Sequence, residues 1–199
     1  MARFDERSGN LYVTELGRVA SHYYVRHRTI VEFGERLHNN MSEAEIFDLI
    51  SGSAEFEQMN VREDEIVELE KLGRRECGVE LKHGVDSKRG KANVLIQSFI
   101  SRARIESFSL VADMNYVAQN APRIARALLD IVLKKGWPGM VESILTVCKS
   151  LEMMCWPSQH PLRQFIGQLG PQVSPRAGAR ASPGPSWQGR SASDRDLEC

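Results

Sequence analysis

One stretch of the chain carries polar side chains at a spacing that places them along one side of a helix. The members of this stripe recur at intervals of three and four residues: Tyr116, Gln119, Asn120 and Arg123, with Arg126 one turn after Arg123 as a further candidate. A tyrosine ring can stack on a nucleobase, amides can hydrogen-bond to base edges or sugars, and an arginine can pair with a phosphate. Groups one and two helical turns apart are separated by about 5 and 10 Å, so the stripe predicts contacts with successive nucleotides. The alternative is the polar face of an amphipathic helix that only meets water.

The sequence holds no arrangement of residues that would support catalysis. The segment from Gly84 to Ala92 resembles a phosphate-binding loop, but it has one residue too many between its glycines, and Ala92 stands where a magnesium-binding hydroxyl is required. We expect a flexible turn before a helix there instead. No DExH or DEAD sequence and no Gly-x-Ser-x-Gly elbow occurs, and the five histidines lack metal-binding spacing. The chain by itself is therefore predicted not to be an enzyme and to hold no cofactor or metal.

The polar stripe lies within the longest helical pattern of the sequence, Phe108 to Lys135, which a glycine and a proline close. A second face of this helix carries apolar residues: Val117, Ile124, Leu128 and Ile131. Pro122 interrupts the pattern, and a proline inside a helix costs about 3 kcal/mol unless the helix kinks or restarts. We therefore expect a bend between Asn120 and Arg123.

Other elements follow from capping patterns and turn residues. Three pairs combine a cap residue with a carboxylate three positions later: Thr29 with Glu32, Ser42 with Glu45, and Asn60 with Glu63. Helical patterns also cover Val94 to Ile100 and Met140 to about Met154, while Ala2 to Asp5 and Leu11 to Val13 flank a hairpin turn. We expect four large aromatic side chains to pack in the core or at helix caps: Tyr23, Tyr24, Trp137 and Trp156. The predicted fold is mostly α-helical, a bundle preceded by a hairpin.

Composition agrees with one globular domain, since 42% of the 199 residues are hydrophobic and 26% are charged. The 26 basic residues balance the 26 acidic ones, which excludes a uniformly basic nucleic-acid-binding protein. Residues 41–76 nevertheless carry a net charge of −7, and residues 86–135 carry +5. This polarity fits either a local groove for a polyanion or ordinary solvated helix faces.

The C-terminal end is expected to lie outside the fold. Residues 171–199 are mostly Pro, Gly, Ser and Ala, which bury too little apolar surface to offset the entropy of ordering, so we predict a disordered tail over residues 166–199. No window approaches the roughly 18 apolar residues of a membrane helix, and no apolar signal segment starts the chain. The four cysteines form no Cys-x-x-Cys pair and are expected to be reduced, in the nucleus or cytosol.

Four short strings carry a family resemblance: TELGRVASHYY at 14–24, EF at 55–56 with VREDE at 61–65, YVAQNA at 116–121, and PLRQF at 161–165. In this order they resemble the Sec-sixty-three (Sec63) homology domain, which follows the motor domains of large Ski-two-like helicases. The resemblance covers about Arg3 to Phe165. Because motor sequences are missing and the pattern stops after Phe165, we expect the chain to be a fragment of such a helicase.

The resemblance implies a domain organisation and a function. Residues 1–24 would be the end of a winged-helix domain, its terminal hairpin and exit helix, and residues 25–165 would be a helical bundle, the N-terminal part of the Sec63 homology domain. The helix from Asp113 to Lys135 would be the ratchet helix that crosses the nucleic-acid channel. The implied partners are single-stranded RNA or DNA, the motor domains and the complex subunits of the parent protein, with no membrane; ATP and magnesium would be bound in the motor.

Two alternatives remain open at this point. The chain could be a protein-interaction scaffold without nucleic-acid binding, in which the acidic face of residues 41–76 is the working surface. It could also expose apolar helix faces and form nothing stable alone.

Overall fold

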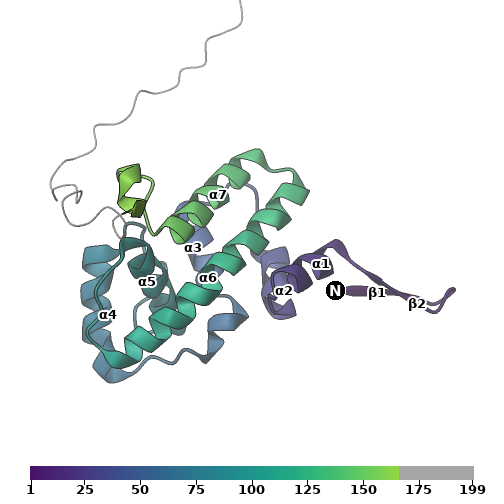
Figure 1. Cartoon of the computed structure of the whole chain (residues 1–199). Coiled ribbons are helices and arrows are strands. Elements are labelled where there is room, and N and C mark those ends of the chain that lie inside the picture. Colours follow the sequence, from purple (N-terminus) through teal and green to yellow (C-terminus); the bar gives the residue numbers. More distant parts are fainter. Residues whose placement is uncertain (166–199) are drawn as a thin grey trace, which may run out of the picture. The chain divides into compact units, whose positions relative to one another are not determined.

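The structure of the chain, a computed structural model, describes residues 1–165, and these fall into two units that divide after Pro157. The first unit contains the strands β1 (Ala2–Asp5) and β2 (Asn10–Val13), and the helices α1 (Glu15–His22), α2 (His27–Arg36), α3 (Glu43–Ser51), η1 (Ala54–Gln58), α4 (Glu63–Glu76), α5 (Lys88–Ser101), α6 (Phe108–Lys135) and α7 (Pro138–Met153) (Figure 1). The second unit holds the short 3₁₀ helix η2 (Pro161–Phe165). The predicted disordered tail, 166–199, lies outside the described residues. The mostly helical fold with an N-terminal hairpin is thereby confirmed.

The predicted hairpin forms between β1 and β2. The two strands pair antiparallel, with Ala2 opposite Val13 and Asp5 opposite Asn10. The Asp5 carboxylate accepts hydrogen bonds from the Arg7 backbone N–H (3.1 Å) and from the Ser8 hydroxyl (2.7 Å), which close the turn. These bonds favour the charged form of Asp5 and lower its pKa.

The core is built around α5, which contacts α3, α4, α6, α7 and η1. From Gly90 to Ser98 every residue of this helix is buried, so α5 is enclosed on all sides. The Ser87 hydroxyl caps its start by accepting from the Gly90 N–H (3.0 Å). A side chain at Gly90 would place its Cβ 1.9 Å from the carbonyl oxygen of Gly84, so only glycine fits this close approach. The segment that we expected to be only a turn therefore includes the first residues of α5.

Two of the capping predictions concern α3 and α4. At α3, the Glu45 N–H donates to the Ser42 hydroxyl (3.3 Å) and the Ser42 N–H donates to the Glu45 carboxylate (2.8 Å), which confirms the capping box. At α4, the cap residue is Arg62, so the assignment of Asn60 as the cap is wrong. The chain stays extended for two further residues because the Asn60 carbonyl is held by a buried lysine, described below.

The third capping prediction, Thr29 with Glu32, is wrong because α2 already begins at His27. Thr29 lies inside the helix, and its hydroxyl donates to the carboxylate of Glu55 (2.5 Å). The same carboxylate accepts from the Arg26 N–H (2.7 Å). The negative charge that stabilises the start of α2 thus comes from a residue distant in sequence rather than from a local cap.

Helix α6 runs without interruption from Phe108 through Pro122 to Lys135. The bend expected between Asn120 and Arg123 stays a prediction. Its predicted apolar face is confirmed, since Val117, Ile124 and Leu128 are fully buried. Contacts of α6 with α5 and α7 provide enough burial to hold the helix continuous despite the local cost of the proline. Among residues 1–165, no helix combines the length and apolar character of a membrane span.

Candidate functional site

The five residues of the predicted stripe have different surroundings on α6. Gln119 and Arg126 are exposed, Tyr116 and Arg123 are half-buried, and Asn120 is buried. The exposed residues of α6 follow a face that is rotated from the predicted stripe: Phe108, Val111, Ala112, Asn115, Gln119, Arg126, Leu133, Lys134 and Lys135. We call this the outer face of α6. Only two of the five predicted residues therefore lie on the surface that a ligand reaches directly.

Arg123 is directed at the end of α1. Its guanidinium donates to the carbonyl oxygens of Tyr23 (3.2 Å) and Tyr24 and to the amide oxygen of Asn120 (Nε, 3.1 Å). Because α1 ends at His22, these carbonyls belong to its unsatisfied C-terminal turn, where a cation is favourable. Arg123 thus stabilises the junction between α1 and α2.

Tyr116 and Asn120 extend this set of contacts along α6. The Tyr116 hydroxyl donates to the backbone carbonyl of Glu55 (3.0 Å), and its ring packs edge-on against Phe56, with ring centroids 6.3 Å apart. The Asn120 amide donates to the backbone carbonyl of Tyr116 (2.7 Å). Tyr116 and Arg123 therefore connect α6 to η1 and to the end of α1, while Asn120 bonds to both of them within α6.

A buried ion cluster, which the sequence analysis missed, anchors the first half of α6. Lys91, only 1% exposed, donates to Glu65 (2.6 Å), to Asp113 (2.6 Å) and to the carbonyl of Asn60 (2.8 Å). Glu65 also accepts from the Ser109 hydroxyl. Burial alone would raise the pKa of Glu65, but the hydrogen bonds from Lys91 and Ser109 hold it below its ordinary value. No local signal reveals this cluster, because its members come from α4, α5 and α6.

The difference in net charge between residues 41–76 and residues 86–135 is smaller on the protein surface than in the sequence. Within the acidic segment 41–76, Asp48, Glu55 and Glu65 are buried and serve contacts inside the protein. In the basic segment, Lys91 is buried as well. The net charges counted along the sequence therefore overstate the charges that a partner would meet.

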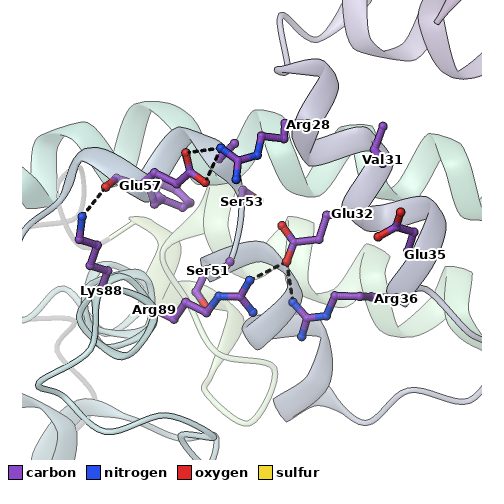
Figure 2. A pocket seen from close by; sticks show the side chains of 13 residues that line it. Arg28, Val31, Glu32, Glu35, Arg36, Ser51, Ser53, Glu57, Lys88 and Arg89 are labelled. Carbon is purple, nitrogen blue, oxygen red and sulfur yellow. Dashed lines mark hydrogen bonds and ion pairs between the residues drawn. The ribbon is translucent and has the colours of Figure 1, made fainter.

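A pocket of about 550 Å³ lies between α2, η1 and the start of α5 (Figure 2). Glu32 pairs with both Arg36 (2.8 Å) and Arg89 (2.7 Å), and Arg28 pairs with Glu57 (3.0 Å), as the dashed lines in Figure 2 show. Its lining contains no histidine or cysteine, and its arginines are engaged by carboxylates. The pocket thus has walls in which ion pairs hold the arginines.

A second groove, of about 320 Å³, lies beside the outer face of α6, between α6, α7 and the end of α1. Tyr23, Leu129 and Leu145 contribute to its walls. At its rim, the Arg126 Nε donates to the Glu152 carboxylate (2.5 Å), and the Arg126 side chain remains 54% exposed. Arg126 is therefore an accessible cation whose charge is shared with one neighbouring carboxylate.

The predicted packing of the aromatic residues is confirmed for three of four. Tyr23, Trp137 and Trp156 are half-buried against the core, and the Trp156 indole donates to the Ser101 hydroxyl (2.8 Å). The prediction is wrong for Tyr24, whose side chain is 85% exposed, because the chain turns outward at this residue.

Residues 1–165 contain no group of three or more His, Cys, Asp or Glu side chains placed to hold a metal ion. Burial raises the pKa of the Cys77 thiol and of the Cys148 thiol to about 12. A nearby carboxylate contributes to each shift, Glu76 for Cys77 and Glu152 for Cys148. Neither thiol is therefore poised as a nucleophile.

Comparison with known proteins identifies a family. The profile of the Sec63 Brl domain matches residues 13–187. This match extends beyond Phe165, where the resemblance was expected to end. The DExH-box ATP-dependent RNA helicase DExH14 of Arabidopsis thaliana is 49% identical over 169 residues, which are 85% of this chain and 8% of the plant protein.

Two human proteins give similar figures. Activating signal cointegrator 1 complex subunit 3 is 46% identical over 165 residues, and the U5 small nuclear ribonucleoprotein 200 kDa helicase is 42% identical over 165 residues. Each alignment covers 83% of this chain and 8% of the relative. The chain thus spans less than a tenth of the length of the curated relatives that it matches. The four sequence strings, the helical fold and the family profile agree, and the chain belongs to the Sec63 Brl domain family, found in ATP-dependent RNA helicases.

Proposed function

We propose that this chain is a nucleic-acid-binding bundle of an ATP-dependent helicase and that the outer face of α6 lies against a single strand. The observation that carries the proposal is the exposure of Gln119 and Arg126 on this face. They are seven residues apart, which is about 10 Å along the helix, so they can meet one strand at two points. Gln119 offers amide hydrogen bonds, and Arg126 offers a cation for a phosphate.

In this proposal the other three stripe residues act indirectly, by fixing the position of α6. Tyr116 and Arg123 hold α6 against η1 and the α1–α2 junction, and Asn120 orients the Arg123 guanidinium, through the hydrogen bonds described above. They keep the outer face at a fixed orientation, which lowers the entropy cost of binding. ATP and magnesium would be bound by the motor domains of the parent helicase, while this chain holds the strand between steps.

A protein-interaction scaffold is the second candidate, and the hairpin favours it. The side chains of Phe4, Leu11 and Val13 are 58%, 71% and 57% exposed. Apolar side chains gathered on a short two-stranded hairpin suit contact with another part of the parent protein or with another subunit.

The test is a fluorescence-polarisation titration of a labelled single-stranded oligonucleotide, RNA or DNA, at two salt concentrations. We expect binding that weakens with salt, because phosphate contacts release counterions. Arg126→Gln should weaken binding and reduce the salt slope by about 0.7, the value for one lost contact on a single strand. Glu152→Gln should have the opposite effect on affinity, because it removes the carboxylate that competes for Arg126.

A matched control is available on α4. Arg74 is an exposed arginine that pairs with Glu70 (3.2 Å), as Arg126 pairs with Glu152, but it lies on a different helix. Arg74→Gln should leave the affinity and the salt slope unchanged. A folded chain that binds no strand at low salt would refute the proposal and favour the scaffold.

A further inference from the structure

Tyr24 is an exposed aromatic residue that packing does not explain. Its side chain is 85% exposed. Within residues 1–165, its ring and hydroxyl take part in no hydrogen bond or ring contact, and only its backbone is engaged, by Arg123. The residue that follows, Val25, is buried and fixes the chain at this point. The ring is therefore presented to solvent from a rigid backbone.

The backbone of Tyr24 adds a second anomaly. The Tyr24 N–H donates to the Ser21 carbonyl (3.4 Å) and the Val25 N–H donates to the Ala20 carbonyl (2.9 Å), the pattern of a Schellman motif at the end of α1. Tyr24 occupies the left-handed position of this motif, with φ 52°. Glycine or asparagine is favoured there, and an aromatic residue is strained.

The described chain has three other non-glycine residues with positive φ: Asn40, Arg102 and Met154. Asn40 is of a type that tolerates this conformation, whereas Arg102 and Met154, like Tyr24, lie at the C-terminal end of a helix. Of these three helix-terminal residues, Tyr24 has an exposed side chain, while Arg102 and Met154 are half-buried. Residues that violate a local rule without a packing benefit are expected at functional positions.

The surroundings of Tyr24 favour a polyanionic partner. Arg26 and Arg28, two and four residues further along the chain, are exposed; the Arg26 guanidinium donates to the Ala54 carbonyl (3.0 Å) and Arg28 pairs with Glu57 (3.0 Å). Arg123 binds the Tyr24 carbonyl. Arg123 lies one helical turn from both Gln119 and Arg126, so its contact with the Tyr24 carbonyl brings the Tyr24 backbone close to this part of α6. An exposed aromatic ring among arginines is the combination that binds single-stranded nucleic acids by stacking and charge.

We infer that the Tyr24 ring is a stacking platform for an unpaired nucleobase, at the α1–α2 junction that Arg123 joins to α6. This inference rests on the proposed function and extends it by a residue on the α1–α2 junction. The ring would take a base of any sequence, because every base has a π-face. The strained backbone would present the ring without the entropy cost of ordering a flexible loop.

The test compares Tyr24→Asn with Tyr24→Phe in the full chain. Asparagine fits the left-handed backbone and removes the ring, so the fold should be retained; thermal unfolding followed by circular dichroism checks this. Loss of one stacked base should weaken binding of a single strand by about 5- to 150-fold in Tyr24→Asn, while Tyr24→Phe should bind like the wild type. Tyr12→Asn, at an exposed tyrosine on the hairpin, is the matched control and should bind like the wild type.

An abasic strand separates stacking from charge. It keeps the phosphates but has no base to stack, so wild type and Tyr24→Asn should bind it equally. If the wild type binds normal strands and Tyr24→Asn binds them equally well, the stacking inference fails while the proposed function stands. An equal loss on abasic strands would also overturn the inference, because the effect would then not involve a base. If the wild type binds no strand at all, the proposed function and the inference fail together.

Discussion

The buried Lys91 gives a strong prediction about stability. The Lys91 ammonium donates to Glu65, Asp113 and the Asn60 carbonyl, so all three of its protons are used inside the protein. Lys91→Met keeps the length and packing of the side chain but leaves the buried Glu65 carboxylate with a longer contact to the exposed Arg62 guanidinium (3.9 Å) in place of the buried Lys91 contact (2.6 Å). Removing one partner of a buried ion pair lowers the free energy of unfolding by about 3–5 kcal/mol. Native domains are stable by only about 5–15 kcal/mol, so the loss is a large fraction of the total.

Urea denaturation followed by circular dichroism measures this change. With a slope of about 2 kcal/mol per molar urea, the midpoint should fall by about 2 M. The double variant Lys91→Met/Glu65→Gln should lose less than the sum of the two single variants, because it removes the stranded charge. Lys149→Met, at an exposed lysine on α7, is the control and should change stability by no more than about 0.5 kcal/mol. A loss below about 1 kcal/mol in Lys91→Met would refute the reasoning.

The pH dependence gives an independent check. In the wild type, the pKa of Glu65 lies below its ordinary value. The contribution of Glu65 to folding stability is therefore complete above that ordinary value and is lost as the pH falls through the lowered pKa. In Lys91→Met, burial without the Lys91 ammonium should raise the pKa of Glu65. Protonation of Glu65 as the pH falls then removes the cost of burying its charge. The stability difference between wild type and Lys91→Met should therefore shrink between neutral and acidic pH. A difference that stays constant would show that Glu65 is not the stranded group.

Three further outcomes follow from other contacts. Arg123→Met should destabilise the chain by about 1–3 kcal/mol in urea denaturation, because the carbonyls at the end of α1 lose their donor; an unchanged midpoint would contradict this role. Ser42→Ala should lower the free energy of unfolding by about 0.5–2 kcal/mol in the same assay, since it removes the cap of α3. An equal loss of stability in Ser143→Ala would show that the cap has no special role. Cys77 and Cys148 should be alkylated by iodoacetamide only after unfolding, as followed by mass spectrometry, because the pKa of each thiol is raised to about 12; rapid labelling of the folded chain would disprove their burial.

The sequence by itself was sufficient where the signal is local. The hairpin, the bounds of α6 and the capping box of Ser42 and Glu45 were predicted correctly, because turn composition, helical periodicity and capping act over a few residues. The same local strings were sufficient to predict the family. The helix continues through Pro122, because burial against α5 and α7 outweighs the local cost of a proline inside a helix.

Only the tertiary structure decided which stripe residues face outward. Periodicity put five polar residues on one side of α6, yet Arg123 contacts a carbonyl 100 residues away and Tyr116 one 61 residues away. The start of α2 likewise depends on Glu55, and the cluster of Lys91 joins three helices. These partners meet only when the helices pack, and a buried polar group bonds to whatever donor or acceptor the packing brings near. Local patterns therefore determine the elements, while packing decides which polar residues remain available to a ligand.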